Sequence, residues 1–310
     1  MGAAQTRIDA AEAAVPGAAP RNFSPGGSSV VGIHPAANSR LKAFEQSLAL
    51  RPPPEKGVPL FAGVDLGTAY IVTAVVDADG APVAGVVTRS RSSVRDGLVF
   101  DYLGATNLLR AQVETIRRAG YPIRDAMVCF PPGTEGRNAR VFGNVLEAAD
   151  LHVVGLLDEP SSAAAVLEID EGAVVDVGGG TTGISILEGG KVVYTADEPT
   201  GGTHVDLVLA GNFHVSTDEA ERMKTDVSRQ RDLFPVVRPV FQKIGAIVRR
   251  HLAGRSVRTL YLVGGTSCFP GIAEVVREET GLPVLVPDHA LLVTPLGIAM
   301  HCAREAAGRG

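Results

Sequence analysis

The chain has 310 residues, 45% of them hydrophobic and 20% charged, which is a globular composition with room for two hydrophobic cores. Its net charge of −5 leaves no basic excess to neutralise a polyanion, so nucleic acid is not an expected partner. No stretch is apolar over the length of a membrane span. We therefore expect a cytoplasmic protein with no integral membrane segment.

The three cysteines are Cys129, Cys268 and Cys302, which are far apart in the sequence. They form no CxxC or Cys/His spacing of the kind that binds zinc, and their odd number fits a reducing compartment. We expect them to be small buried side chains rather than catalysts.

Residues 1–57 are rich in Ala, Gly, Pro and Ser and contain few large apolar side chains, which predicts a mostly disordered tail. A short amphipathic helix is predicted within it over residues 39–50, because Leu41, Phe44 and Leu48 fall on one helical face. Two interpretations of this helix stay open. It packs on the body of its own chain, or it binds a partner protein or, less readily, a membrane surface.

The body begins with strands that are broken by glycine turns, and this pattern occurs twice. Asp65-Leu-Gly-Thr interrupts the first apolar run, and Asp176-Val-Gly-Gly-Gly-Thr interrupts the second. Each is followed at the same spacing by a further hairpin turn. We interpret this as an internal repeat with one copy per lobe. The helical stretches between and after the copies then predict an α/β fold.

The glycines of the second copy suit an anion-binding turn better than other glycine-rich motifs. Gly178, Gly180 and Gly183 match G-x-G-x-x-G, but a strand follows them where a dinucleotide fingerprint requires a helix. The lysine of a Walker loop and the companion motifs of a protein kinase are missing. A hairpin turn remains, whose backbone N–H groups and the hydroxyls of Thr181 and Thr182 can meet an anion. A tight turn without a ligand is the alternative.

Three later segments complete an ordered set of motifs. They are Glu-Pro before a run of small residues at 159–165, Val-Gly-Gly-Thr at 263–266, and the small-residue helix that begins at Thr294. With the two aspartate-glycine turns, this order resembles the actin, sugar-kinase and Hsp70 ATPase superfamily. Within it, "VRDGLVFDYLGA", "FPPGTEGRNARV", "ADEPTGGTHVDLVLAGN" and "AERMK" resemble the EutJ family, Hsp70-like proteins of ethanolamine utilisation.

The resemblance implies a two-lobed actin/Hsp70-ATPase-like fold of ribonuclease H-like repeats, with a nucleotide cleft between the lobes. The first lobe would cover residues 58–159 and the second residues 160–293. The C-terminal helix, residues 294–310, would pack back on the first lobe.

The resemblance also implies roles for individual residues, with ATP and Mg²⁺ as the cofactors. Asp65 and Asp176 would hold Mg²⁺ through water, which suits a hard cation. Glu159 would orient the attacking water, although a carboxylate at a helix start has an ordinary capping role as well. The catalytic set would be Asp65, Glu159, Asp176 and Thr181. The phosphates would contact Gly67, Thr68, Gly178, Gly179, Gly180, Thr181 and Thr182.

The purine and ribose would meet the second lobe. Glu221 and Lys224 correspond to the family's contacts, although an i, i+3 surface ion pair explains them as well. Gly264, Gly265 and Thr266 would complete the adenosine side.

By the same resemblance, the function is that of an Hsp70-like, nucleotide-dependent assembly factor for microcompartment shell or cargo proteins, which the tail helix would contact. In the interval where Hsp70 carries its catalytic lysine, this sequence offers only arginines in a different setting, such as Arg89, Arg91 and Arg95, so hydrolysis would be slow. An actin-like filament, which would be oligomeric, and a small-molecule kinase of the same superfamily are the alternatives.

Overall fold

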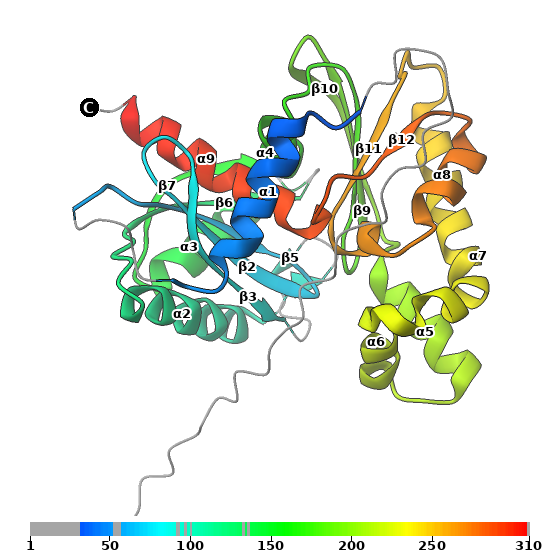
Figure 1. Cartoon of the computed structure of the whole chain (residues 1–310), viewed down its shortest axis with the longest axis horizontal. Coiled ribbons are helices and arrows are strands. Elements are labelled where there is room, and N and C mark those ends of the chain that lie inside the picture. Colours follow the sequence, from blue (N-terminus) through cyan, green and yellow to red (C-terminus); the bar gives the residue numbers. More distant parts are fainter. Residues whose placement is uncertain are drawn as a thin grey trace, which may run out of the picture.

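The computed structural model describes residues 32–51, 57–90, 94–95, 98–99, 101–131, 134 and 137–308. Of the tail that was predicted to be mostly disordered, residues 1–57, residues 1–31 and 52–56 lie outside this set, and Arg91 lies outside it as well. The described chain forms two lobes, each built on a five-stranded sheet (Figure 1). The expected two-lobed fold is therefore present.

The first lobe contains a mixed sheet with the strand order β3-β2-β1-β6-β7. Its strands are β1 (Phe61–Leu66), β2 (Tyr70–Val76), β3 (Pro82–Arg89), β6 (Asp125–Phe130) and β7 (His152–Asp158). β1, β2 and β3 form an antiparallel meander, and β6 continues the sheet parallel to β1. Its helices are α2 (Tyr102–Arg118) and α3 (Arg137–Ala148), and a small ribbon joins β4 (Val94–Arg95) to β5 (Leu98–Val99).

The second lobe repeats this topology with the order β10-β9-β8-β11-β12. Its strands are β8 (Gly172–Val177), β9 (Thr182–Glu188), β10 (Lys191–Glu198), β11 (Leu260–Val263) and β12 (Val284–Leu285). Its helices are α5 (Gly202–Phe213), α6 (Thr217–Thr225), α7 (Val227–Leu252) and α8 (Ile272–Thr280). The meander followed by parallel strands occurs in both sheets, which confirms the internal repeat.

Two helices connect the lobes, and both depend on close backbone contact. α4 (Glu159–Leu167) crosses α9 (Val293–Ala307) at Gly297, where a Cβ atom would lie 2.0 Å from the Ser162 carbonyl oxygen. α9 also packs on β1 at Gly63, where a Cβ atom would lie 2.2 Å from the Ala299 nitrogen. Only glycine allows helices and strand to approach this closely.

Helix α1 (Pro35–Ser47) begins four residues before the predicted span of 39–50. The His34 ring caps it by accepting a hydrogen bond from the Ala36 nitrogen, and Pro35 occupies the first turn. The apolar face is buried as predicted, with Leu41 and Phe44 fully covered. Phe44 packs over Gly85 of β3, where a Cβ atom would lie 2.5 Å from the ring.

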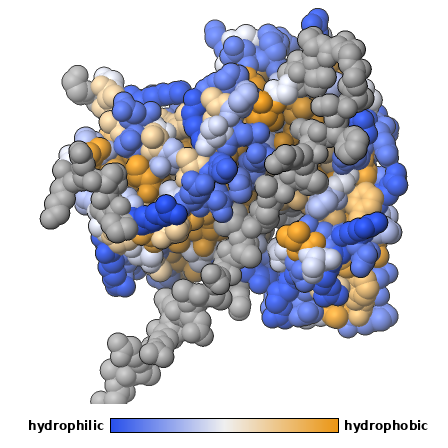
Figure 2. Space-filling view, viewed as in Figure 1, coloured by the Kyte–Doolittle hydropathy of each residue, from blue (hydrophilic) through white to orange (hydrophobic). Residues whose placement is uncertain are grey.

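α1 therefore packs on its own chain, which is the first of the two interpretations. It contacts both lobes: Phe44 lies on β3, while the Asn38 side-chain oxygen accepts from the Asp288 nitrogen at 3.0 Å. Arg40 forms an ion pair of 2.5 Å with Glu168, at the end of α4. The surface that α1 presents outward is mostly hydrophilic (Figure 2). The apolar face is thus covered by the chain itself, and partner binding through this helix stays a prediction.

None of the helices in the described part of the chain combines the length and the apolar character that crossing a membrane requires.

Candidate functional site

The two glycine turns face each other across a cleft between the lobes. The cleft contains about 1160 Å³ of space, its open mouth included. Nearly all of the predicted site residues line it. They are Asp65, Gly67, Thr68, Glu159, Asp176, Gly178, Gly179, Gly180, Thr181, Glu221, Lys224, Gly264, Gly265 and Thr266.

Hydrogen bonds to its carbonyl groups hold the turn from β8 to β9 in place. The Gly178 carbonyl accepts from the Gly202 nitrogen at 2.9 Å and from the Thr266 hydroxyl at 2.8 Å. The Gly179 carbonyl accepts from the Thr203 nitrogen at 2.7 Å. Because C=O and N–H point in opposite directions in a trans peptide, the next amides point away from these donors. This is the orientation that an anion-binding turn requires.

The two turns are also in contact with each other. A Cβ atom on Gly179 would lie 2.8 Å from the Ala69 Cβ atom, and one on Gly180 would lie 3.0 Å from the Thr68 hydroxyl. The lobes therefore meet at the glycine turns, and the absence of side chains there is what lets them approach.

Three carboxylates gather at the floor of the cleft from three elements. Asp65 lies near the end of β1 and Asp176 near the end of β8. Glu159 opens α4, because the preceding Asp158 caps this helix by accepting from the Ser161 nitrogen at 2.9 Å. The duplicated topology thus places one aspartate from each repeat and one helix-start glutamate at the same point.

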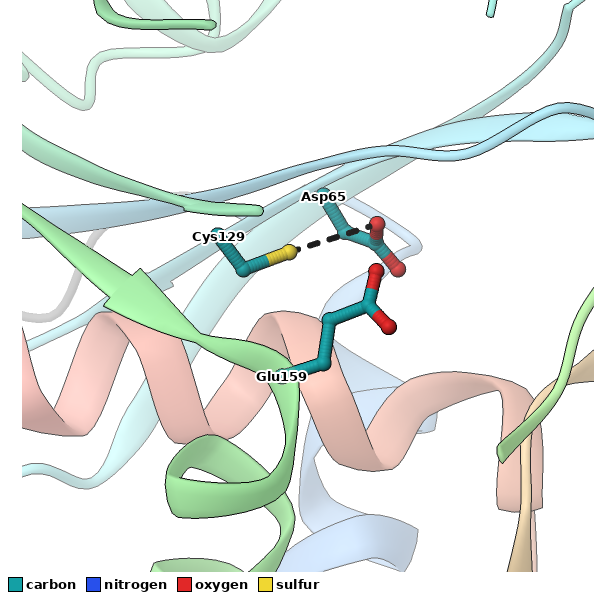
Figure 3. Close-up of side chains that lie close together, drawn as sticks. All are labelled: Asp65, Cys129 and Glu159. Atoms are coloured by element: carbon teal, nitrogen blue, oxygen red, sulfur yellow. Dashed lines mark hydrogen bonds between the residues drawn. The ribbon is translucent and has the colours of Figure 1, made fainter. Parts of the chain in front are cut away.

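Cys129 of β6 joins this group, which the sequence did not indicate. Its thiol lies 3.7 Å from Asp65 Oδ1, and ligand atoms of Cys129, Asp65 and Glu159 all lie within 4.8 Å of one another (Figure 3). The prediction that all three cysteines are buried is confirmed. The spacing rules for cysteine could not detect this contact, because it forms between adjacent strands of the folded sheet.

Burial raises the pKa values of these carboxyl groups. The pKa of Asp65 rises to about 7, first through burial and then through repulsion from Asp176. The pKa of Asp176 rises to about 6 through burial, opposed by the hydroxyl of Thr294, which donates to it at 3.2 Å. The pKa of Glu159 rises well above its usual range through burial, Asp176 and Asp65.

This donor set fits a divalent cation. Carboxylates crowded in a cleft repel one another when ionised, and a hard dication with oxygen ligands or bridging waters would remove that repulsion. The Asp65 and Asp176 oxygens suit Mg²⁺ in this role, whereas the Cys129 thiol is not a ligand that Mg²⁺ prefers.

Glu221 and Lys224 line the cleft but do not pair with each other. Glu221 of α6 accepts from the guanidinium of Arg89, which lies at the end of β3 in the first lobe. Lys224 lies 2.8 Å from Asp206 of α5 and donates to the Gly202 carbonyl at 3.2 Å. The surface i, i+3 pair considered from the sequence is therefore absent between these two residues.

Thr182 differs from its predicted role. It is buried at the start of β9, and its hydroxyl donates to the Thr200 carbonyl at 2.6 Å. Strand alternation explains this, since Thr181 faces the cleft and its neighbour must face the opposite side. Sequence reasoning missed the contacts of Thr294 and Asp206. The Thr294 hydroxyl donates to Asp176, 118 residues away, and Asp206 accepts from Lys224, 18 residues away, so no short-range pattern indicates either contact.

These features define an actin-like two-lobed protein with an interlobe cleft. Residues 84–229 match the MreB/Mbl protein family, and residues 173–297 match the family of cell division protein FtsA. The structure of MreB 5 of Spiroplasma citri bound to AMPPNP has a TM-score of 0.66 to this chain at 17% identity, covering 83% of this chain and all of that one.

Nearer relatives specify the family. Ethanolamine utilization protein EutJ of Escherichia coli K12 is 45% identical over 252 residues, covering 81% of this chain and 88% of that protein. The crystal structure of EutJ from Carboxydothermus hydrogenoformans has a TM-score of 0.80 at 43% identity and covers 85% of this chain and 98% of that one. The chain belongs to the EutJ family of ethanolamine utilisation proteins.

Proposed function

We propose that the interlobe cleft binds MgATP. The observation that supports this most directly is the meeting of two glycine turns above three carboxylates that come from both lobes. Related folds support the choice of ligand, since the structures of MreB 5 of Spiroplasma citri are bound to AMPPNP and to ADP.

In this proposal the backbone of the two turns contacts the phosphates, with Thr68 and Thr181 supplying hydroxyls. Asp65 and Asp176 hold Mg²⁺, which supplies charge neutralisation for phosphoryl transfer. Glu159 orients the attacking water. Among the described residues that line the cleft, Lys224 carries a positive charge, but its ammonium is engaged by Asp206. Hydrolysis is accordingly slow, below the roughly 1–100 s⁻¹ of kinases.

The experiment that tests nucleotide binding is thermal unfolding of the wild type and of Asp176→Ala, with and without MgATP. A ligand that binds only the folded state stabilises it by about 2.7 kcal/mol at a hundredfold excess over Kd. We expect this rise in the wild type and its loss in the variant. No rise in the wild type at millimolar MgATP would mean that the cleft is a scaffold without a nucleotide.

We further propose that nucleotide binding controls an Hsp70-like assembly role toward shell or cargo proteins of an ethanolamine-utilisation microcompartment in the cytoplasm. Membership of the EutJ family supports the metabolic setting. The test is binding of the purified protein to each enzyme and shell protein of that system, with MgATP, with MgADP and without nucleotide. Affinity that does not depend on the nucleotide would contradict an assembly role of this kind.

The same samples test the filament alternative. A filament would sediment at high speed in a nucleotide-dependent manner, whereas the assembly factor remains in the supernatant. Pelleting with MgATP but not with MgADP would favour the filament instead.

A further inference from the structure

An ion pair joins the two lobes at the cleft, where Glu221 is one of the lining residues. Arg89 is the last residue of β3 in the first lobe, and Glu221 lies on α6 in the second. The Arg89 guanidinium donates to Glu221 Oε2. The side chains are only 34% and 19% exposed, so the pair is partly shielded from water.

Tyr70 and Thr225 are neighbours of the pair. Tyr70 lies opposite Arg89 in the β2–β3 register and lines the cleft beside Glu221. The Thr225 hydroxyl donates to the Glu221 carbonyl at 2.9 Å. The pKa of Arg89 is raised, first by its hydrogen bond to Glu221, so the guanidinium stays charged.

We propose that the Arg89–Glu221 pair is an interlobe latch that restricts entry of ribonucleotides to the cleft. A carboxylate holds a vicinal diol by accepting one hydroxyl on each oxygen. Arg89 occupies one of the two Glu221 oxygens, so a ribose that uses both must displace it. Nucleotide binding then opens the latch and frees α6 to move relative to the first lobe. The ligand in this inference rests on the proposed function, whereas the restraint between the lobes does not.

The restraint is tested without nucleotide. Spin labels are attached at Glu114→Cys on α2 and Asp232→Cys on α7, two exposed positions in different lobes, while the three native cysteines are buried. The interlobe distance distribution is then measured by double electron–electron resonance. We expect Arg89→Ala to lengthen and broaden it, and the charge-swapped Arg89→Glu/Glu221→Arg double variant to restore it.

The matched control is Arg238→Ala, which removes an arginine paired at 2.7 Å with Glu278 inside the second lobe and should leave the distance unchanged. An unchanged distance in Arg89→Ala would overturn the latch.

The effect on ligands is tested with MgATP and Mg-2′-deoxy-ATP. Arg89→Ala should bind MgATP up to about fivefold more tightly, the factor expected for an ion pair with this exposure. The gain should be smaller for the deoxynucleotide, which lacks one of the two hydroxyls. Equal gains for both nucleotides would overturn the role of the diol. A widened interlobe distance without MgATP binding by either protein would support the latch and contradict the proposed nucleotide function.

Discussion

The cleft combines charged residues with glycines. Asp65, Glu159 and Asp176 bring negative charge together, and Gly264 leaves room beside Asp176. A Cβ atom on Gly264 would lie 2.2 Å from Asp176 Oδ1, and its φ of +86° also favours glycine. The Asp176 carboxylate can take its position only because Gly264 carries no side chain.

The crowded carboxylates predict a pH-dependent stability. The pKa values of Asp65 and Asp176 are about 7 and about 6 in the folded chain, against 3.8 when unperturbed, so the folded state binds more protons between these values. The free energy of unfolding therefore falls as pH rises from about 4 to about 7. Urea titrations in EDTA at several pH values should show this loss, and Mg²⁺ should reverse it at about pH 8.

The control for this prediction is the Asp65→Asn/Asp176→Asn double variant, which lacks these two titrating carboxyl groups and whose stability should vary less with pH. A wild-type stability that rises through this interval would show that other groups dominate.

The contact between the glycine turns predicts the effect of one methyl group. Gly179→Ala would place a Cβ atom 2.8 Å from that of Ala69, so the lobes must separate at the glycine turns. We expect MgATP affinity to fall at least tenfold by calorimetry, with little change in fold. Gly211→Ala is the control, since a Cβ atom there has open space on α5. Equal affinities of the two variants would show that the turns can separate without cost.

At the scale of elements, the lobes are joined by helices that pack by opposite means. α4 and α9 approach through small residues at Ser162 and Gly297, whereas α1 is held by large apolar side chains over β3. α1 also carries polar contacts to Glu168 and Asp288. A helix from the N-terminal region is thus a structural part of both lobes.

Removal of one anchor of α1 should reveal its contribution. Phe44 is fully buried against Gly85, so Phe44→Ala should lower the free energy of unfolding by about 3–5 kcal/mol, measured by urea unfolding. Lys42→Ala changes an exposed position of the same helix and should stay within about 0.5 kcal/mol of wild type. Similar stabilities of the two variants would mean that α1 contributes little to the fold.

At the scale of the molecule, the lobes share a hydrophobic core. One continuous cluster includes Phe44 of α1, Val72 of β2, Val174 of β8, Val263 of β11 and Leu296 of α9. Separate clusters fill the outer part of each lobe. The shared cluster couples the two repeats, because neither lobe can unfold without exposing apolar surface of the other.

This shared core predicts one cooperative unfolding transition instead of two. Differential scanning calorimetry should give a single peak whose calorimetric and van't Hoff enthalpies agree. Two resolved transitions would show that each lobe is stable alone. The wild type without nucleotide is the appropriate sample, since a bound ligand also couples the lobes.

The repeat, the two-lobed fold and most of the cleft residues could be predicted from the amino-acid sequence. Period-two strands interrupted by glycine turns are local signals, and the aspartates and threonines within them have fixed positions relative to the strand ends. The order of the motifs then indicated the family. The burial of Thr182 could also have been predicted, since successive side chains of a strand point to opposite faces and Thr181 faces the cleft.

The contacts between side chains that are distant in the sequence could be recognised only in the folded chain. Cys129 approaches Asp65 across adjacent strands, Thr294 donates to Asp176 from a helix 118 residues away, and Arg89 pairs with Glu221 across the two lobes. The surface on which α1 packs could not be predicted either. An amphipathic pattern shows that one face of a helix will be buried, but it does not show which surface covers that face. Such contacts depend on how packed elements are placed in space, and short-range periodicity carries no information about that placement.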